Sequence, residues 1–169
     1  LAHPMNAGYR ARGPADEIAL IRATGEAARI LGPRAQPLHW KPHPVLASLP
    51  GMHAQAVRAA AREAGFAEVP GGARLEDLAG AARWLVTSPS TVALDLLQAG
   101  RLALLLDPQG STPGTALAAL PSAATRPDDI AQALAALDDA PAADARLAAC
   151  LATIRPAGPL DLAAIGTGR

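Results

Sequence analysis

A chain of 169 residues, half of them hydrophobic, is long enough for one compact domain with a real core. Its 15 basic and 15 acidic residues balance to a net charge of zero without a pronounced basic run, which argues against a broad nucleic-acid-binding face. No window approaches the roughly 20 apolar residues of a membrane-spanning helix. The single cysteine, Cys150, excludes an internal disulfide and is expected to be a small buried side chain on a late helix.

Helices and strands are predicted to alternate through the first half of the chain. After a loop over residues 1–13, Pro14 opens a helix whose first turn carries Asp16 and Glu17, and Gly32-Pro33 ends it. The segments predicted next are a strand over 38–41, a helix over 52–64, a short strand over 66–69 and a helix over 75–82.

The central stretch has the pattern strand, tight turn, helix, glycine, strand. Residues 84–86 and 102–106 are short apolar runs, which are typical of buried parallel strands. Between them, Ser90 is placed to cap a helix over Thr91–Gln98, and Gly100 is placed to end it in a left-handed conformation.

The last third begins with a loop rich in turn-forming residues over 107–114. A capping-box pattern starting at Thr125 opens a helix, and a last helix is predicted over 142–154. Because strands alternate with helices, we expect an α/β fold with a mainly parallel sheet, as one domain over residues 1–169. Residues 140–169 would then form a C-terminal helix and tail.

Two turns at predicted strand ends carry residues suited to binding a ligand. In a parallel sheet both open at the carboxyl edge, where ligands bind in this architecture. Lys41, the only lysine of the chain, supplies a positive charge at the first turn, next to His43. The second turn offers the hydroxyls of Ser88, Ser90 and Thr91 and the backbone N–H groups of a helix start. Together these groups suit a nucleotide phosphate.

Asp95 lies one helical turn inside that helix, where its carboxylate could accept hydrogen bonds from ribose hydroxyls. Each of these residues also has an ordinary structural explanation. The hydroxyls are common turn and capping groups, Lys41 can be a solvated strand end, His43 can close its turn, and Asp95 can be an exposed helix charge. Their joint placement on successive strand ends favours a phosphate site, and no metal site is predicted.

Lys-Pro-His-Pro, followed later by Ser-Pro-Ser-Thr-Val-Ala-Leu-Asp-Leu-Leu-Gln-Ala-Gly, resembles the C-terminal half of GT-B glycosyltransferases of the bacterial capsule and lipopolysaccharide type. The chain is similar to capsule polysaccharide (Kdo-transferase-like) proteins and to bacterial sialyltransferases over roughly residues 35–135, and more distantly to CDP-glycerol glycerophosphotransferases. The resemblance implies a Rossmann-like, doubly wound domain. In it, His43 contacts the phosphate of a CMP-sugar, and Ser90 and Thr91, with Ser88 nearby, hold that phosphate from the helix start.

The activity implied is the donor-nucleotide part of an inverting, metal-independent glycosyltransferase in surface polysaccharide synthesis. The nucleotide-sugar donor takes the place of a cofactor, and the acceptor is a glycan or a lipid-linked glycan. The Asp/Glu-Asp-Gly motif that carries the sialyltransferase base is absent, so an N-terminal GT-B domain is the expected partner and source of the base. With no basic region or apolar stretch of a signal peptide at the start, the expected location is cytoplasmic, at the inner face of the membrane.

Two other functions stay open at this point. One is a non-catalytic α/β module that binds a phosphorylated metabolite or a protein. The other is half of a sugar-nucleotide epimerase, because those enzymes share the architecture.

Overall fold

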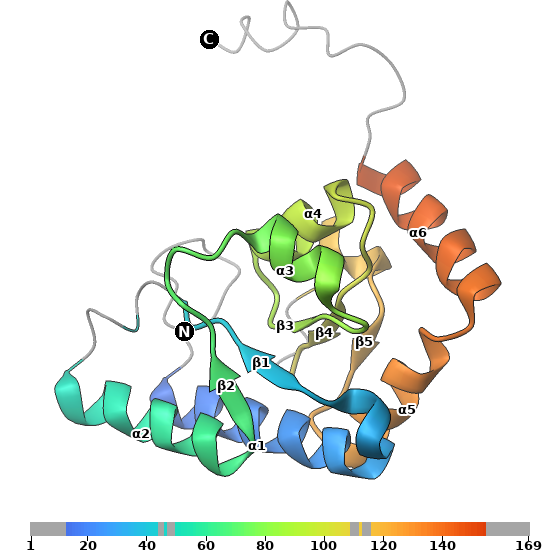
Figure 1. Cartoon of the computed structure of the whole chain (residues 1–169). Coiled ribbons are helices and arrows are strands. Elements are labelled where there is room, and N and C mark those ends of the chain that lie inside the picture. Colours follow the sequence, from blue (N-terminus) through green and yellow to red (C-terminus); the bar gives the residue numbers. More distant parts are fainter. Residues whose placement is uncertain (1–12, 44–45, 47–49, 109–111, 113–115, 155–169) are drawn as a thin grey trace, which may run out of the picture.

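The computed structural model of the chain describes residues 13–43, 46, 50–108, 112 and 116–154. The predictions for the first twelve residues, for most of the 107–114 loop and for the tail after Ile154 lie outside the described residues. Figure 1 shows the arrangement of the elements. In chain order they are α1 (Pro14–Leu31), the 3-10 helix η1 (Gly32–Ala35), β1 (Leu38–Trp40), α2 (Gly51–Glu63), β2 (Phe66–Glu68), α3 (Leu75–Ala81), β3 (Val86–Thr87), α4 (Thr91–Gln98), β4 (Leu104–Leu106), the 3-10 helix η3 (Ala116–Ala119), β5 (Ser122–Ala123), α5 (Pro127–Ala136) and α6 (Ala140–Ile154).

The fold is α/β, and all the strand pairs among the described residues are parallel. The strands form two small sheets, one of β1 and β2 and one with the order β3-β4-β5. In the first sheet His39 lies opposite Ala67, and in the second Thr87 lies opposite Leu105. Within the described part of the chain, no backbone ladder joins β1 to β3, so the single sheet predicted from the sequence is divided in two.

β4 is the most deeply buried strand, and its side chains divide between two layers of helices. Leu104 and Leu106 pack in a cluster with residues of α1 and α5, such as Ile130. Leu105 points to the opposite face and packs against Leu97 of α4 and residues of α6. This alternation is what a parallel strand covered on both faces requires.

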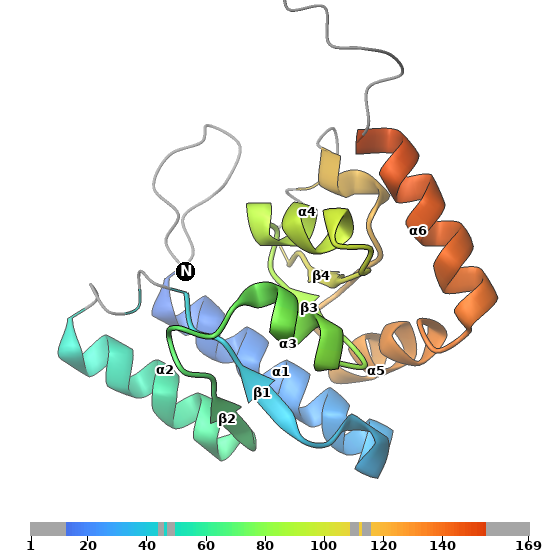
Figure 2. The same ribbon diagram turned by 45° about the horizontal axis from the view of Figure 1, so that its top comes forward.

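α1 packs against both sheets and so holds them together. Leu20 belongs to the cluster around Leu104 of β4, whereas Ile21 belongs to a cluster with Val57 of α2, against which Trp40 of β1 packs. In both ribbon views α1 and α2 lie side by side along the same side of β1 and β2 (Figures 1 and 2). The two sheets are therefore connected through a shared helix rather than through hydrogen bonds between strands.

The strand predicted over 84–86 is displaced along the chain, to Val86–Thr87. Trp84 lies before the strand, and its Nε1 donates a hydrogen bond of 2.9 Å to Asp138. The strand predicted over 102–106 is likewise shorter, Leu104–Leu106, and its pairing begins where Leu104 N donates to Leu85 O at 2.8 Å. Three elements were not predicted, η1, η3 and β5, because at four, four and two residues each is too short for a pattern to be read from the sequence.

The predicted helix boundaries are largely confirmed. Helix α4 spans the predicted residues and ends at Gln98, and Gly100, two residues beyond, has the expected left-handed conformation with a φ of +76°. Ser90 occupies the predicted N-cap position, but its side chain makes no capping hydrogen bond. For α5 the N-cap is Arg126 and not the predicted Thr125, and it too has no side-chain cap. Among the described helices, none is both long and apolar enough to cross a membrane.

Candidate site at the carboxyl ends of β1, β3 and β4

The segment after β1 is anchored at both ends. Trp40 O accepts a hydrogen bond of 2.8 Å from Val69 N beyond β2, and Leu46 is buried between α1 and α2. Leu46 N also donates to His43 O at 2.9 Å, which fixes a turn with the half-buried His43 at its start. His43 is thus tied by one backbone hydrogen bond to a buried residue of the core.

Lys41 is exposed and reaches toward the loop before α3. Its Nζ donates a hydrogen bond of 2.8 Å to the carbonyl oxygen of Ala73. An ammonium group has three donors, so this bond positions the charge and leaves capacity for an anion. The Lys41 ammonium group therefore lies at the carboxyl end of β1, close to the loop that leads into α3.

The turn after β3 combines a buried proline with three hydroxyl groups at different depths. Pro89 is buried, Ser88 and Ser90 are half-buried, and Thr91 is exposed. Ser90 O accepts from Ala93 N at 3.1 Å, which starts α4. Because the Ser90 hydroxyl makes no capping bond to α4, the positive amino end of this helix is not closed by its own N-cap side chain.

The two turns follow the carboxyl ends of β1 and β3. In both ribbon views β1 and β3 run in the same direction, and the segments that follow them leave on the same side of the molecule (Figures 1 and 2). Asp95 is placed differently. The buried residues of α4 are Ala93, Leu96 and Leu97, and Asp95, which is exposed, lies on the side of the helix away from them.

A third strand end carries a carboxylate that the sequence analysis left as part of a loop. Asp107 directly follows β4 and is half-buried. Its Oδ2 accepts two hydrogen bonds from the buried Thr112, one of 2.9 Å from the backbone N and one of 3.0 Å from Oγ1. The signal was present in the sequence, since Asp107 follows an apolar strand just as Lys41 and Ser88 follow theirs.

A cluster of paired charges lies where the chain enters β3, and not at these strand ends. Asp138, just after α5, accepts hydrogen bonds of 3.0 and 2.9 Å from Arg83 and one from the indole of Trp84. The Arg83 guanidinium, with help from Trp84 and Arg34, lowers the pKa of Asp138 below its ordinary value. Arg83 also lies over the Trp84 ring, 4.9 Å from its centroid. The cluster ties the end of α5 to the start of β3 and has a structural role.

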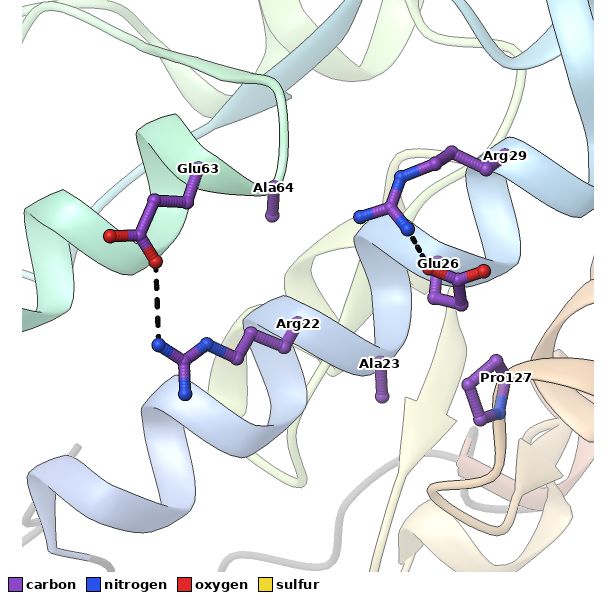
Figure 3. A pocket seen from close by; sticks show the side chains of 7 residues that line it. All are labelled: Arg22, Ala23, Glu26, Arg29, Glu63, Ala64 and Pro127. Carbon is purple, nitrogen blue, oxygen red and sulfur yellow. Dashed lines mark hydrogen bonds and ion pairs between the residues drawn. The ribbon is translucent and has the colours of Figure 1, made fainter.

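A pocket of about 470 Å³ lies between α1, the end of α2 and the start of α5 (Figure 3). Its charged side chains pair with one another: Arg22 donates to Glu63 at 3.3 Å, and Arg29 pairs with Glu26. None of the residues predicted to bind phosphate lines this pocket. It is therefore separate from the strand-end turns.

Cys150 is buried on α6, as predicted, and its thiol donates to Ala119 O at 3.1 Å. Burial raises the pKa of this thiol, so it is a packing residue. Among the described residues, no group of three His, Cys, Asp or Glu side chains is arranged to hold a metal ion. Comparison with protein-family models, curated proteins and solved structures finds no match to the chain.

Proposed function

We propose that this chain is the donor-nucleotide half of a glycosyltransferase that uses a CMP-sugar or a similar nucleotide-sugar in surface polysaccharide synthesis. Its task is to hold the nucleotide phosphate and to stabilise the negative charge that develops on it as the sugar leaves. The observation that carries the proposal is the pair of anion-suited turns at the carboxyl ends of β1 and β3, one with Lys41 and His43 and one with the open start of α4.

The finer fold that we propose is a doubly wound one in which the two small sheets are parts of one layer. Three observations support it: α1 packs on both sheets, β1 and β3 run in the same direction, and all the ladders are parallel. The strand order would be β2-β1-β3-β4-β5, with the direction of winding reversed between β1 and β3. Ligands of open α/β sheets bind outside the carboxyl ends of the strands at such a reversal.

In this arrangement each phosphate-binding group has a role that follows from its chemistry. Lys41 neutralises phosphate charge, His43 and the hydroxyls of Ser88, Ser90 and Thr91 donate hydrogen bonds, and the first N–H groups of α4 complete the anion site. Donors that are fixed before the reaction stabilise the leaving phosphate without having to reorganise. The base that activates the acceptor belongs to an N-terminal GT-B domain, and the enzyme would act in the cytoplasm at the inner face of the membrane.

Calorimetric titration with CMP, CDP, UDP and inorganic phosphate tests the proposal. We expect CMP to bind with a dissociation constant in the micromolar to millimolar range, and His43→Ala and Ser90→Ala each to weaken binding by roughly tenfold or more, the scale of a hydrogen bond to a charged group. Because Ser90 makes no capping bond, its alanine variant is expected to keep its stability, so that the loss reports on the ligand.

Matched controls come from the same two sheets. His39 lies on β1 and Ser122 on β5, both are exposed, and neither follows a strand end. Their alanine variants are expected to bind CMP as the wild type does. A folded wild-type chain that binds none of the four compounds would refute the proposal and favour a non-catalytic protein-binding module. Hydrolysis of a UDP-sugar with epimerisation by the chain joined to its partner domain would indicate an epimerase half instead.

A further inference from the structure

The pocket between α1, the end of α2 and the start of α5 contains two ion pairs and lies apart from the proposed phosphate site. Its volume of about 470 Å³ falls within the roughly 300–1,000 Å³ that small-molecule sites occupy. Arg22 pairs with Glu63 of α2 at 3.3 Å, and Arg29 pairs with Glu26 on α1 itself. Figure 3 shows the first pair on the α2 side of the pocket and the second pair farther along α1. The pocket thus offers polar groups at two places along one helix.

The charges that line this pocket cancel. Two guanidinium groups and two carboxylates are present, so the lining has no net charge. Among the described residues, each of these four side chains has its ion-pair partner within the pocket. An anion would have to compete with the carboxylate already paired with each guanidinium, and a cation would have to compete in the same way for each carboxylate. The pocket therefore favours a ligand without charge.

Hydrogen-bonding capacity remains in these groups after the ion pairs have formed. A guanidinium has five N–H donors and a carboxylate has about four acceptor positions, of which one ion pair uses only a part. The side chains of Arg22 and Glu63 are 63% and 65% exposed, so their other donors and acceptors face water that a ligand can replace. A hydroxyl group both accepts and donates, so a single ligand hydroxyl can accept from Arg22 and donate to Glu63 without separating the pair.

The spacing of the polar groups also suits a row of hydroxyls. Arg22, Glu26 and Arg29 are at positions i, i+4 and i+7 of α1, which place them along one face of the helix over about 10 Å. The rest of the lining is small and apolar, namely Ala23, Ala64 and Pro127. Their C–H groups can pack against the face of a sugar ring, whereas a large apolar ligand would find no large apolar side chain to contact.

We propose that this pocket binds a neutral saccharide, whose hydroxyls hydrogen-bond to the two Arg–Glu pairs and whose ring packs against the small apolar residues. The saccharide site is a second site, and it does not depend on the proposed nucleotide site at the strand ends. Binding is expected to be weak, in the millimolar range, because both ion pairs are largely exposed.

Amide NMR spectra of the isotope-labelled chain, recorded during titration with glucose, galactose, N-acetylglucosamine and maltose, test the inference. We expect at least one of these sugars, at up to about 100 mM, to shift the amide signals of Ala23, Glu26 and Ala64. Raising sodium chloride from about 50 to about 500 mM should leave the affinity unchanged, because salt screens charged ligands and not neutral ones. Arg22→Ala combined with Glu63→Ala should weaken binding roughly tenfold, since more than one hydrogen bond is lost.

The matched control is Arg58→Ala combined with Glu68→Ala. That ion pair of 3.1 Å joins α2 to β2, also lies at the surface and does not line the pocket, so the control should bind sugar as wild type does. Surface ion pairs contribute little to stability, and both double variants are therefore expected to fold.

The inference is overturned if none of the four sugars shifts the pocket signals, or if the two double variants bind sugar equally well. Shifts of the same signals by inorganic phosphate or glycine in place of the sugars would also overturn it, because they would assign a charged ligand to the pocket. CMP binding is measured separately, so the nucleotide site and the saccharide site can each fail without the other.

Discussion

The close contact between α1 and α2 gives the sharpest stability prediction. Gly25 is buried in α1, and a Cβ built on it would lie 2.7 Å from the Cβ of Ala64 and 2.9 Å from the Ala64 carbonyl oxygen. Both distances are shorter than real side-chain contacts allow, and one of the opposing atoms belongs to the backbone. Gly25→Ala therefore has to push the end of α2 away from α1.

Two effects of opposite sign decide the magnitude. Alanine gains roughly 0.5–1 kcal/mol over glycine in a helix interior. Overpacking a tight contact costs about 1–3 kcal/mol. Because the clash includes a backbone oxygen that no rotamer change relieves, we expect the second effect to exceed the first. Gly25→Ala should lower the free energy of unfolding by about 1–2 kcal/mol.

The matched control is Gly80→Ala on α3. Gly80 is exposed and has no atom within 4 Å of an added Cβ, so only the helix-propensity gain applies. Urea unfolding at pH 7, followed by far-UV circular dichroism, should show G25A destabilised and G80A stabilised by roughly 0.5–1 kcal/mol. Adding Ala64→Gly to G25A should recover part of the loss. A G25A variant as stable as G80A would show that α1 and α2 do not approach as closely as described.

Three further outcomes follow from the core and the Asp138 cluster. Asp138→Asn should lower the free energy of unfolding at pH 7 by about 1 kcal/mol, after allowance for partial exposure, while Asp139→Asn should change it little. Because the fold lowers the pKa of Asp138 from 3.8, the stabilising effect of its carboxylate is present above that pH and is lost as the pH falls further. Equal urea unfolding curves of wild type and D138N at pH 7 would contradict this prediction. Cys150 should resist a thiol reagent in the native state and react at once in urea, because its buried thiol has a raised pKa, and fast native labelling would contradict that burial. Leu105→Ala should cost about 2–5 kcal/mol in the same unfolding assay, as a cavity in a fully buried position does, and a cost below 1 kcal/mol would show that β4 is not covered on both faces.

Much of the helical structure is determined by the sequence alone, because helices begin and end through contacts between residues a few positions apart. Pro14 opens α1 as predicted, and glycines at 32, 65 and 100 take up positive φ at or just after the ends of α1, α2 and α4. The turn with the His43 imidazole and the turn with the serine hydroxyls could also be recognised from local sequence, since each follows an apolar run. These parts of the fold could be predicted because no distant residue has to be known.

The positions of the strands were decided by tertiary contacts. Trp84 was predicted to begin the strand but lies before β3, and its indole donates to Asp138, which is 54 residues away. The division into two sheets depends on α1 packing against both, and β5 exists only because β4 offers it a partner. Asp107 was predicted as part of a loop, and the structure places it directly after β4, where its carboxylate accepts two hydrogen bonds from Thr112. Strand pairing joins residues far apart in the chain, so the contacts that stabilise these arrangements cannot be recognised in any short stretch of sequence.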